Sequence, residues 1–259
     1  MKRLIIGGFE KVYEISKDFR NEGIDRNHNP EFTMLEFYCA YWDYEDCMDV
    51  VEELIRHAAR KVDALKIKWG SHAIDLTKRF KRKPFLGLIK EATGYDFKDF
   101  DKKEIMNVCI DNKIEIGSEL NEGQMLDKLM SILIEPTLIE PTFVIDYPKI
   151  ISPLAKSHRS GDENIVERFE LFIGSSEFSN SFTELNDPID QRARLQEQAR
   201  LKELGDEEAQ PIDENFIQAM ECGMPPTGGV GLGIDRLVML LTGNRWIKDV
   251  ILFPTLRTE

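Results

Sequence analysis

Charged and aromatic side chains are mixed in one short segment of the chain, residues 19–38, which reads FRNEGIDRNHNPEFTMLEFY. Its charged and titratable members include Arg20, Glu22, Arg26, His28, Glu31 and Glu36, and its aromatic members are Phe19, Phe32, Phe37 and Tyr38. A surface segment carries such charges but seldom so many aromatic rings, whereas a core strand carries the rings without the charges. The combination predicts a strand–loop–strand that lines a polar pocket for a planar, charged ligand.

A glycine-rich segment near the other end of the chain, residues 228–241, reads GGVGLGIDRLVMLL. Gly229, Gly231 and Gly233 alternate, so in a strand they clear one face for close approach of a ligand. Arg236 follows at the expected start of an apolar helix, where amide donors and the positive dipole end favour anions. Taken alone, such a turn is also compatible with packing only.

A third segment, residues 167–187, reads ERFELFIGSSEFSNSFTELND and lies between the other two. Residues 19–38 resemble motif 2 of the class II aminoacyl-tRNA synthetases in their lysine-specific form. Residues 167–187 resemble the metal- and amino-acid-binding strands of these enzymes, and residues 228–241 resemble their motif 3. The resemblance extends from Met1 almost to Glu259.

The pattern of elements favours an α+β fold. Strands and helices alternate irregularly, with several hairpin-like pairs, so an antiparallel sheet flanked by helices is preferred to a doubly wound parallel sheet. The resemblance implies one class II catalytic domain over residues 1–259, truncated at its N-terminus, with a small helical insertion at about 84–135.

Local patterns predict the individual elements. Residues 4–6 and 11–15 resemble strands, and residues 64–76 resemble a hairpin. Residues 44–60 carry apolar side chains at helical spacing behind Asp43, a typical N-cap, and predict an amphipathic helix.

Composition limits the class of protein. The chain has 259 residues and a formal net charge of −13, which disfavours a nonspecific nucleic-acid binder. The basic cluster at residues 78–84, KRFKRKP, indicates a solvated loop or, alternatively, a tRNA contact. The four cysteines have no metal-ligand spacing and suggest buried free thiols in a reducing cytoplasm. Because the apolar patch at residues 4–9 is short and no apolar run is membrane-long, neither a leader nor a membrane span is expected.

The resemblance implies a nucleotide site. Aminoacylation begins with attack of an amino-acid carboxylate on the α-phosphorus of ATP, so the protein must hold two anions in line and offset their charge. Arg20 would bind the α-phosphate and the substrate carboxylate, and Arg236 would contact the terminal phosphate and pack over adenine. Phe32 would stack on the other face of the base. The base and phosphates would be positioned by Glu22, His28 and Asn29.

The resemblance also implies a metal and a lysine pocket. Glu170 and Glu177 would hold Mg²⁺ against the ATP phosphates, with a turn at residues 174–176 bringing them together. Glu184 would meet the side-chain ammonium of L-lysine. The rest of the lysine site would be formed by Glu36, Tyr38, Asn180, Phe182 and Gly231.

The sequence begins just before motif 2, whereas the family carries an anticodon-binding domain and the dimer-forming motif 1 ahead of it, together with one glutamate of the lysine pocket. We therefore expect weak or no aminoacylation of tRNA(Lys) by this chain alone, and a homodimer in a longer form. The fold leaves three alternatives open: a paralogue that lysylates elongation factor P, an aspartyl- or asparaginyl-tRNA synthetase, and a non-catalytic synthetase-like binding module. The Glu36 and Glu184 carboxylates disfavour the second, since an acidic substrate requires a basic pocket.

Overall fold

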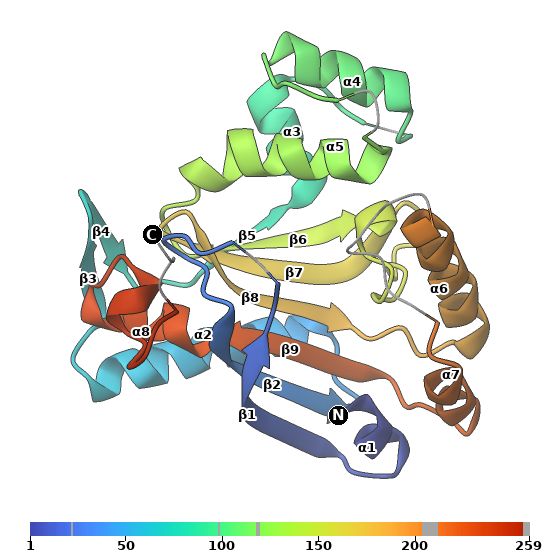
Figure 1. The fold of residues 1–259 in the computed structure, drawn as a ribbon, viewed down its shortest axis with the longest axis horizontal. Helices are drawn as coiled ribbons and strands as arrows, with labels where there is room; N and C mark the ends of the chain where they lie inside the picture. Colours follow the sequence, from blue (N-terminus) through green and yellow to red (C-terminus); the bar gives the residue numbers. More distant parts are fainter. Residues whose placement is uncertain (22, 98, 118–119, 204–211, 256–259) are drawn as a thin grey trace.

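The computed structural model describes residues 1–21, 23–97, 99–117, 120–203 and 212–255. Its centre is a seven-stranded sheet in the order β1-β2-β9-β8-β7-β6-β5, and a separate hairpin is formed by β3 and β4 (Figure 1). All neighbouring strands in the large sheet are antiparallel except β5 and β6, which run parallel. The strands are β1 (Lys11–Phe19), β2 (Glu31–Ala40), β3 (Lys66–Trp69), β4 (His72–Asp75), β5 (Lys81–Pro84), β6 (Thr142–Pro148), β7 (Ile165–Ile173), β8 (Ser176–Thr183) and β9 (Thr227–Gly233).

Helices surround this sheet. The α-helices of the described residues are α1 (Lys2–Ile6), α2 (Tyr44–Lys61), α3 (Phe85–Thr93), α4 (Lys102–Asp111), α5 (Glu122–Leu129), α6 (Pro188–Glu203), α7 (Glu214–Glu221) and α8 (Ile234–Thr242). Figure 1 shows α3, α4 and α5 gathered beyond β5 and β6, and α6 beside α7 on the side of the sheet away from the β3–β4 hairpin. The α+β class with a mostly antiparallel sheet is thus confirmed. Among the described helices none combines the length and the apolar character needed to cross a membrane.

The main core lies between one face of the sheet and helices α2 and α8. Leu35, Phe37 and Val230 project from this face of the sheet and pack with Met48 of α2 and Leu240 of α8. Helix α2 begins where the sequence predicts, because Asp43 accepts hydrogen bonds from the amides of residues 45 and 46 in a capping box. In β9, Val230 and Leu232 face this core, and the glycines that alternate with them lie on the other face of the sheet.

A second core joins the helical region to the sheet. Phe85, Ile105 and Leu126 from α3, α4 and α5 form one buried cluster with Val144 and Phe172 from β6 and β7. These helices lie within the stretch that sequence analysis assigns to an insertion at about 84–135. Because they share their core with the sheet, they do not form a separate apolar interior.

Three local expectations were wrong. Residues 4–6 are the end of helix α1 and not a strand, although residues 11–15 do lie in β1. Cys222 is exposed, whereas the other three free cysteines are buried as expected. The prediction of a solvated loop at residues 78–84 was wrong for residues 81–84, which form β5, whereas residues 78–80 lie outside any helix or strand.

The cations of this basic cluster have acidic partners. Arg82 pairs with Asp49, Lys81 lies 2.5 Å from Glu140, and Lys83 lies 2.8 Å from a carboxylate on α3. The alternative of a tRNA contact at this cluster stays a prediction.

Candidate active site

A cavity of about 520 Å³ opens on the face of the sheet opposite helix α2. Its lining comes from β2, β7, β8 and β9, from the start of α8, from the loop between β1 and β2, and from Lys2 of α1. The three segments that sequence analysis singles out thus meet in one place.

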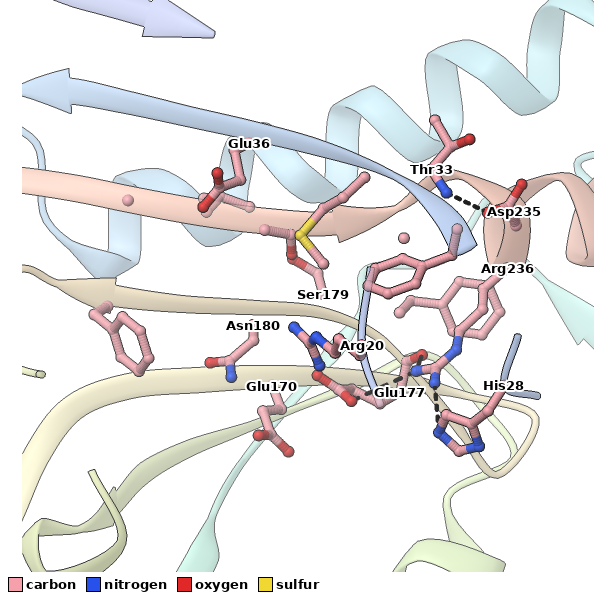
Figure 2. Close-up of a pocket in the computed structure, with 18 of the residues that line it drawn as sticks. Arg20, His28, Thr33, Glu36, Glu170, Glu177, Ser179, Asn180, Asp235 and Arg236 are labelled. Carbon is pink, nitrogen blue, oxygen red and sulfur yellow. Dashed lines mark hydrogen bonds and ion pairs between the residues drawn. The ribbon is translucent and has the colours of Figure 1, made fainter. Parts of the chain in front are cut away.

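Strand register explains why residues far apart in sequence share this cavity. Gly231 pairs with Glu36 on β2 and with Asn180 on β8, and Asn180 pairs in turn with Glu170 on β7. Directly paired residues lie on the same face of a sheet. A single row across four strands therefore presents two carboxylates and an amide around a glycine (Figure 2).

The next row carries the aromatic side chains. Gly229 pairs with Tyr38 on one side and with Phe182 on the other, and Phe182 pairs with Arg168. The glycines of β9 thus form the floor of the cavity, and the rings stand beside it. This is the arrangement that the alternate-glycine pattern predicts.

The two rows differ in how tightly the glycine is enclosed. A Cβ at Gly229 would lie 2.1 Å from Oε1 of Glu184 and 2.6 Å from the ring of Tyr38. A Cβ at Gly231 would lie 3.3 Å from Sδ of Met34, the end of a flexible side chain. Gly229 therefore permits a close approach that no other residue allows, whereas Gly231 leaves some room.

An irregularity in β8 aligns the second acidic residue. The register shifts between Leu171 and Phe172, so that Phe172 pairs with Glu177 while Leu171 pairs with Ser179. The intervening Phe178 packs into the core on the far side of the sheet. The extra residue reverses the alternation, so Glu177 faces the cavity together with Asn180 despite their odd spacing.

The end of the cavity at Glu184 is deeply buried. Glu184 is 1% exposed and forms an ion pair with Lys2, whose side chain is 19% exposed. The hydroxyl of Tyr38 donates a hydrogen bond of 3.1 Å to Oε1 of Glu36. Burial raises the pKa of Glu184, although Lys2 opposes that rise, and burial together with Glu184 and Glu36 raises the pKa of Tyr38.

The opposite end of the cavity holds an arginine at the start of α8. Arg236 donates a hydrogen bond of 2.6 Å to the carbonyl of Glu177, and its other terminal nitrogen lies 3.1 Å from Nε2 of His28. Asp25 contacts Nδ1 of His28 at 2.9 Å. Asp235 accepts a hydrogen bond of 2.6 Å from the amide of Thr33 and ties the helix to β2. Figure 2 shows this group at the end of the cavity away from Glu36.

A second arginine lies at the same end. The guanidinium of Arg20 lies 5.3 Å from the ring centre of Phe32, within the range of a cation–π contact. Its charge also lowers the pKa of Glu177, which desolvation and then Glu170 raise more strongly. Two arginines and an aromatic ring thus line the region that the resemblance assigns to ATP.

The carboxylate of Glu170 is held from both sides. Tyr147 donates a hydrogen bond of 2.8 Å to Oε2, and Arg168 donates to Oε1. Arg168 itself stacks over Tyr147, with 4.5 Å between the guanidinium and the ring centre. Glu135 adds a third carboxyl nearby, and its pKa is raised to about 7 by burial and then by Glu170 and Glu177.

The structure brings together nearly all the residues that the sequence analysis predicts for the site. Those that line the cavity are Arg20, His28, Asn29, Phe32, Glu36, Tyr38, Glu170, Glu177, Asn180, Phe182, Glu184, Gly231 and Arg236. Glu22 lies outside the described residues. The roles assigned to these side chains remain predictions.

Several residues of the site were not found from sequence. Lys2 and Thr33 line the cavity, and Glu135, Tyr147 and Arg168 surround its acidic side chains. Asp235, which contacts Thr33, was also given no role, although its position next to Arg236 in the sequence was a usable signal. For Lys2 there was none, since it lies 182 positions from its partner in the chain.

The composition of the acidic group limits the metals that it suits. Among the described residues, no three histidine, cysteine, aspartate or glutamate side chains are grouped so as to hold a metal ion. Two mutually repelling carboxylates, Glu170 and Glu177, are available instead. Mg²⁺ is usually held by one or two carboxylates, with substrate phosphates and water completing its shell, so this pair suits Mg²⁺.

The cavity thus has arginines and an aromatic ring at one end and a buried carboxylate at the other. The model of the family described as class II tRNA synthetases (D, K and N) matches residues 1–257, and the chain belongs to this family.

Individual relatives are similar over the whole chain. The lysine–tRNA ligase of Aquifex aeolicus (strain VF5) is 51% identical over 263 residues, covering 100% of this chain and 44% of the relative. The lysine–tRNA ligase of Enterococcus faecalis (strain ATCC 700802 / V583) is 51% identical over 259 residues, covering 99% of this chain and 52% of the relative. The chain thus spans about half the length of the curated relatives it matches.

Proposed function

We propose that this chain carries the site at which a lysine–tRNA ligase activates L-lysine with ATP. The lysine carboxylate attacks the α-phosphorus, pyrophosphate leaves, and the lysyl-adenylate then passes its lysyl group to tRNA(Lys). The observation that carries this proposal is the buried carboxylate of Glu184 at the closed end of the cavity, beside Tyr38 and Glu36.

Charge and shape at this end support lysine over other amino acids. A buried carboxylate attracts an ammonium ion and disfavours an aspartate or asparagine side chain. Phe182 stands beside Gly229 and offers an apolar wall for the methylene groups of a long side chain. The relatives that share half of the chain's residues are named lysine–tRNA ligases, which agrees with this choice.

Chemistry at the other end supports ATP. Arg20 and Arg236 would bind the phosphates, and their planar guanidinium groups suit paired phosphate oxygens. Phe32 would stack on the adenine, with His28 and Asn29 beside it. The protein itself supplies orientation and charge compensation here and forms no covalent bond to the substrate.

Glu170 and Glu177 would hold Mg²⁺. When bound, the ion would offset the negative charge on the pyrophosphate leaving group. Tyr147 and Arg168 would keep the Glu170 carboxylate in a fixed orientation, as partners of metal ligands commonly do.

The test is ATP–pyrophosphate exchange by this chain, measured with L-lysine, β-lysine and L-aspartate and accompanied by calorimetric titrations of each ligand. Exchange by this chain alone should be weak, but L-lysine should bind best and drive more exchange than the other two amino acids, and removal of Mg²⁺ with EDTA should stop it until Mg²⁺ is restored. A preference for β-lysine would instead indicate the paralogue that modifies elongation factor P. Binding of neither ATP nor any amino acid would indicate a non-catalytic module.

We also propose a homodimer for a form of the protein as long as its relatives. Tyr13 and Ile15 on β1 are 75% and 61% exposed, and they pair with Phe37 and Leu35 of the main core. They therefore extend an apolar sheet face beyond the part that the described helices cover. Light scattering on the longer form and on its Ile15→Glu variant should give a dimer for the first and a monomer for the second; two monomers would contradict the proposal. Cytoplasmic localisation is a further part of the proposal.

A further inference from the structure

The acid that is proposed to bind the lysine ammonium already has a cation beside it. Lys2 of helix α1 reaches into the cavity and pairs with Oε2 of Glu184. Glu184 is 1% exposed, so without a partner its charge would be strongly disfavoured. Lys2 therefore stabilises the ionised form of this carboxyl before any ligand arrives.

The other oxygen of Glu184 has a different environment. Oε1 lies against the Cα of Gly229, where even a methyl group would clash at 2.1 Å, and Gly229 lines the cavity. Among the described residues Oε1 accepts no hydrogen bond, and the polar contact of the buried Oε2 is its ion pair with Lys2. A carboxylate accepts several hydrogen bonds, so one oxygen can remain with Lys2 while the other accepts from a ligand.

The charges around Glu184 come from three elements. Lys2 lies on α1, Glu36 and Tyr38 lie on β2, and Cys47 lies on α2. Burial raises the pKa of Tyr38 and of Cys47, so both stay neutral between pH 6 and pH 8. Glu36 disfavours the Glu184 carboxylate by repulsion, which leaves Lys2 as the group that opposes both burial and Glu36.

We infer that Lys2 is a positioning residue of the proposed lysine site: it keeps Glu184 ionised and occupies Oε2, so that Oε1 is presented to the side-chain ammonium of the ligand. The inference rests on the proposed function. It adds a residue outside the three motifs and gives a specific reason why helix α1 belongs to the site.

Loss of the Lys2 charge should make lysine binding depend on pH. In Lys2→Met, Glu184 would take up a proton that lysine must displace. Lysine affinity should then rise with pH between 6 and 8 with a slope approaching about tenfold per pH unit, and about one proton should be released per lysine bound. The native chain and Lys2→Arg should show a shallower slope and less proton release, because both keep the cation.

The experiment is calorimetric titration of the full chain with L-lysine at several pH values and in buffers of different ionisation enthalpy. Arg3→Gln is the matched control, because Arg3 pairs with Asp213 at the exposed surface of the same helix. It should behave like the native chain. A Lys2→Met variant with the native slope and the native proton release would overturn the inference.

A second measurement does not need the ligand. Carbon-13 NMR of the glutamate carboxyl groups, with the Glu184 signal assigned by its loss in Glu184→Gln, reports the ionisation of this side chain directly. The titration midpoint should move to higher pH in Lys2→Met and return in Lys2→Arg. An unchanged midpoint would overturn the inference, whereas failure of the native chain to bind lysine would contradict the proposed function and leave the NMR result to decide the role of Lys2.

Discussion

The two ends of the cavity are built differently. At the end proposed to bind the amino acid (the amino-acid end), Glu184 is almost fully enclosed and the backbone of Gly229 touches its carboxylate. At the end proposed to bind the ATP phosphates (the phosphate end), Glu177 keeps 39% of its side-chain surface exposed and His28 keeps 40%. A rigid, dry end suits discrimination between side chains, whereas a partly solvated end suits a large polyanion that arrives with a cation.

The comparison also concerns how charge is balanced. One cation, Lys2, faces two carboxylates at the amino-acid end, which leaves that end negative. At the other end, arginines from a loop and a helix face acids from two strands. Mutations at the two ends should therefore separate lysine binding from ATP binding.

The largest effect is expected at Glu184. Glu184→Gln removes the charge that faces the ligand ammonium, so lysine affinity should fall by about 10³-fold while ATP affinity is unchanged. Calorimetric titration of both ligands measures this. Glu52→Gln is the control, since Glu52 is also buried and ion-paired, with Arg56 at 2.6 Å, but does not line the cavity. Equal losses for lysine and ATP in Glu184→Gln would mean that the fold, and not the pocket, had changed.

A steric change at the same end should have a somewhat smaller effect. In Gly229→Ala the new methyl group meets Glu184 and Tyr38, so lysine affinity should fall by about 100-fold, and overpacking should cost about 1–3 kcal/mol of stability. Gly231→Ala is the matched partner in the same strand. It should cost far less, because Met34 can move away. If the two alanines weaken lysine binding equally, the close contact at Gly229 is not the feature that shapes this end.

At the phosphate end the expected effect is smaller again and falls on the other ligand. Arg236→Gln should lower ATP affinity by about 10- to 100-fold and leave lysine affinity unchanged. Arg26→Gln serves as the control, because Arg26 donates to the carbonyl of Arg245 and does not line the cavity. Competition with a fluorescent ATP analogue measures the change. A comparable loss of lysine affinity in Arg236→Gln would show that the two ends are coupled.

The same comparison explains which features of the site could be predicted from the sequence. The glycine floor follows from alternate glycines in β9, because strand geometry converts spacing of two into one face. The row of Glu36, Asn180 and Glu170 depends on register across four strands, which spacing alone does not specify. These residues could be assigned only through the resemblance to a family.

Other features had no local signal at all. The register shift next to Phe172 places Glu177 on the cavity face of the sheet, and nothing in the surrounding sequence predicts this shift. The apolar run at residues 4–6 resembles a strand, yet tertiary packing of Ile5 fixes it as a helix.

The smallest effect is expected at Glu135, beside the acidic pair. Its folded-state pKa of about 7 lies above the unfolded value, so the folded protein holds this proton more tightly. The folded state is therefore penalised as pH rises from 4.5 to about 7, and the penalty is complete above that range. Because the side chain is partly solvated, Glu135→Gln should recover only about 1 kcal/mol at pH 8, or about 2–4 °C in Tm, and nothing at pH 4.

Thermal unfolding at both pH values, without ligand, measures this change. Glu140→Gln is the contrasting variant, since Glu140 is exposed and Lys81 holds the pKa of its carboxyl below the usual value. It should give no gain at pH 8, because it removes a stabilised charge. A gain at pH 8 in Glu135→Gln alone would mean that the ionised Glu135 carboxyl destabilises the fold, first by its burial and then by repulsion from Glu170 and Glu177. Equal behaviour of the two variants would mean that ionised Glu135 costs the fold no more than the exposed Glu140 carboxylate does.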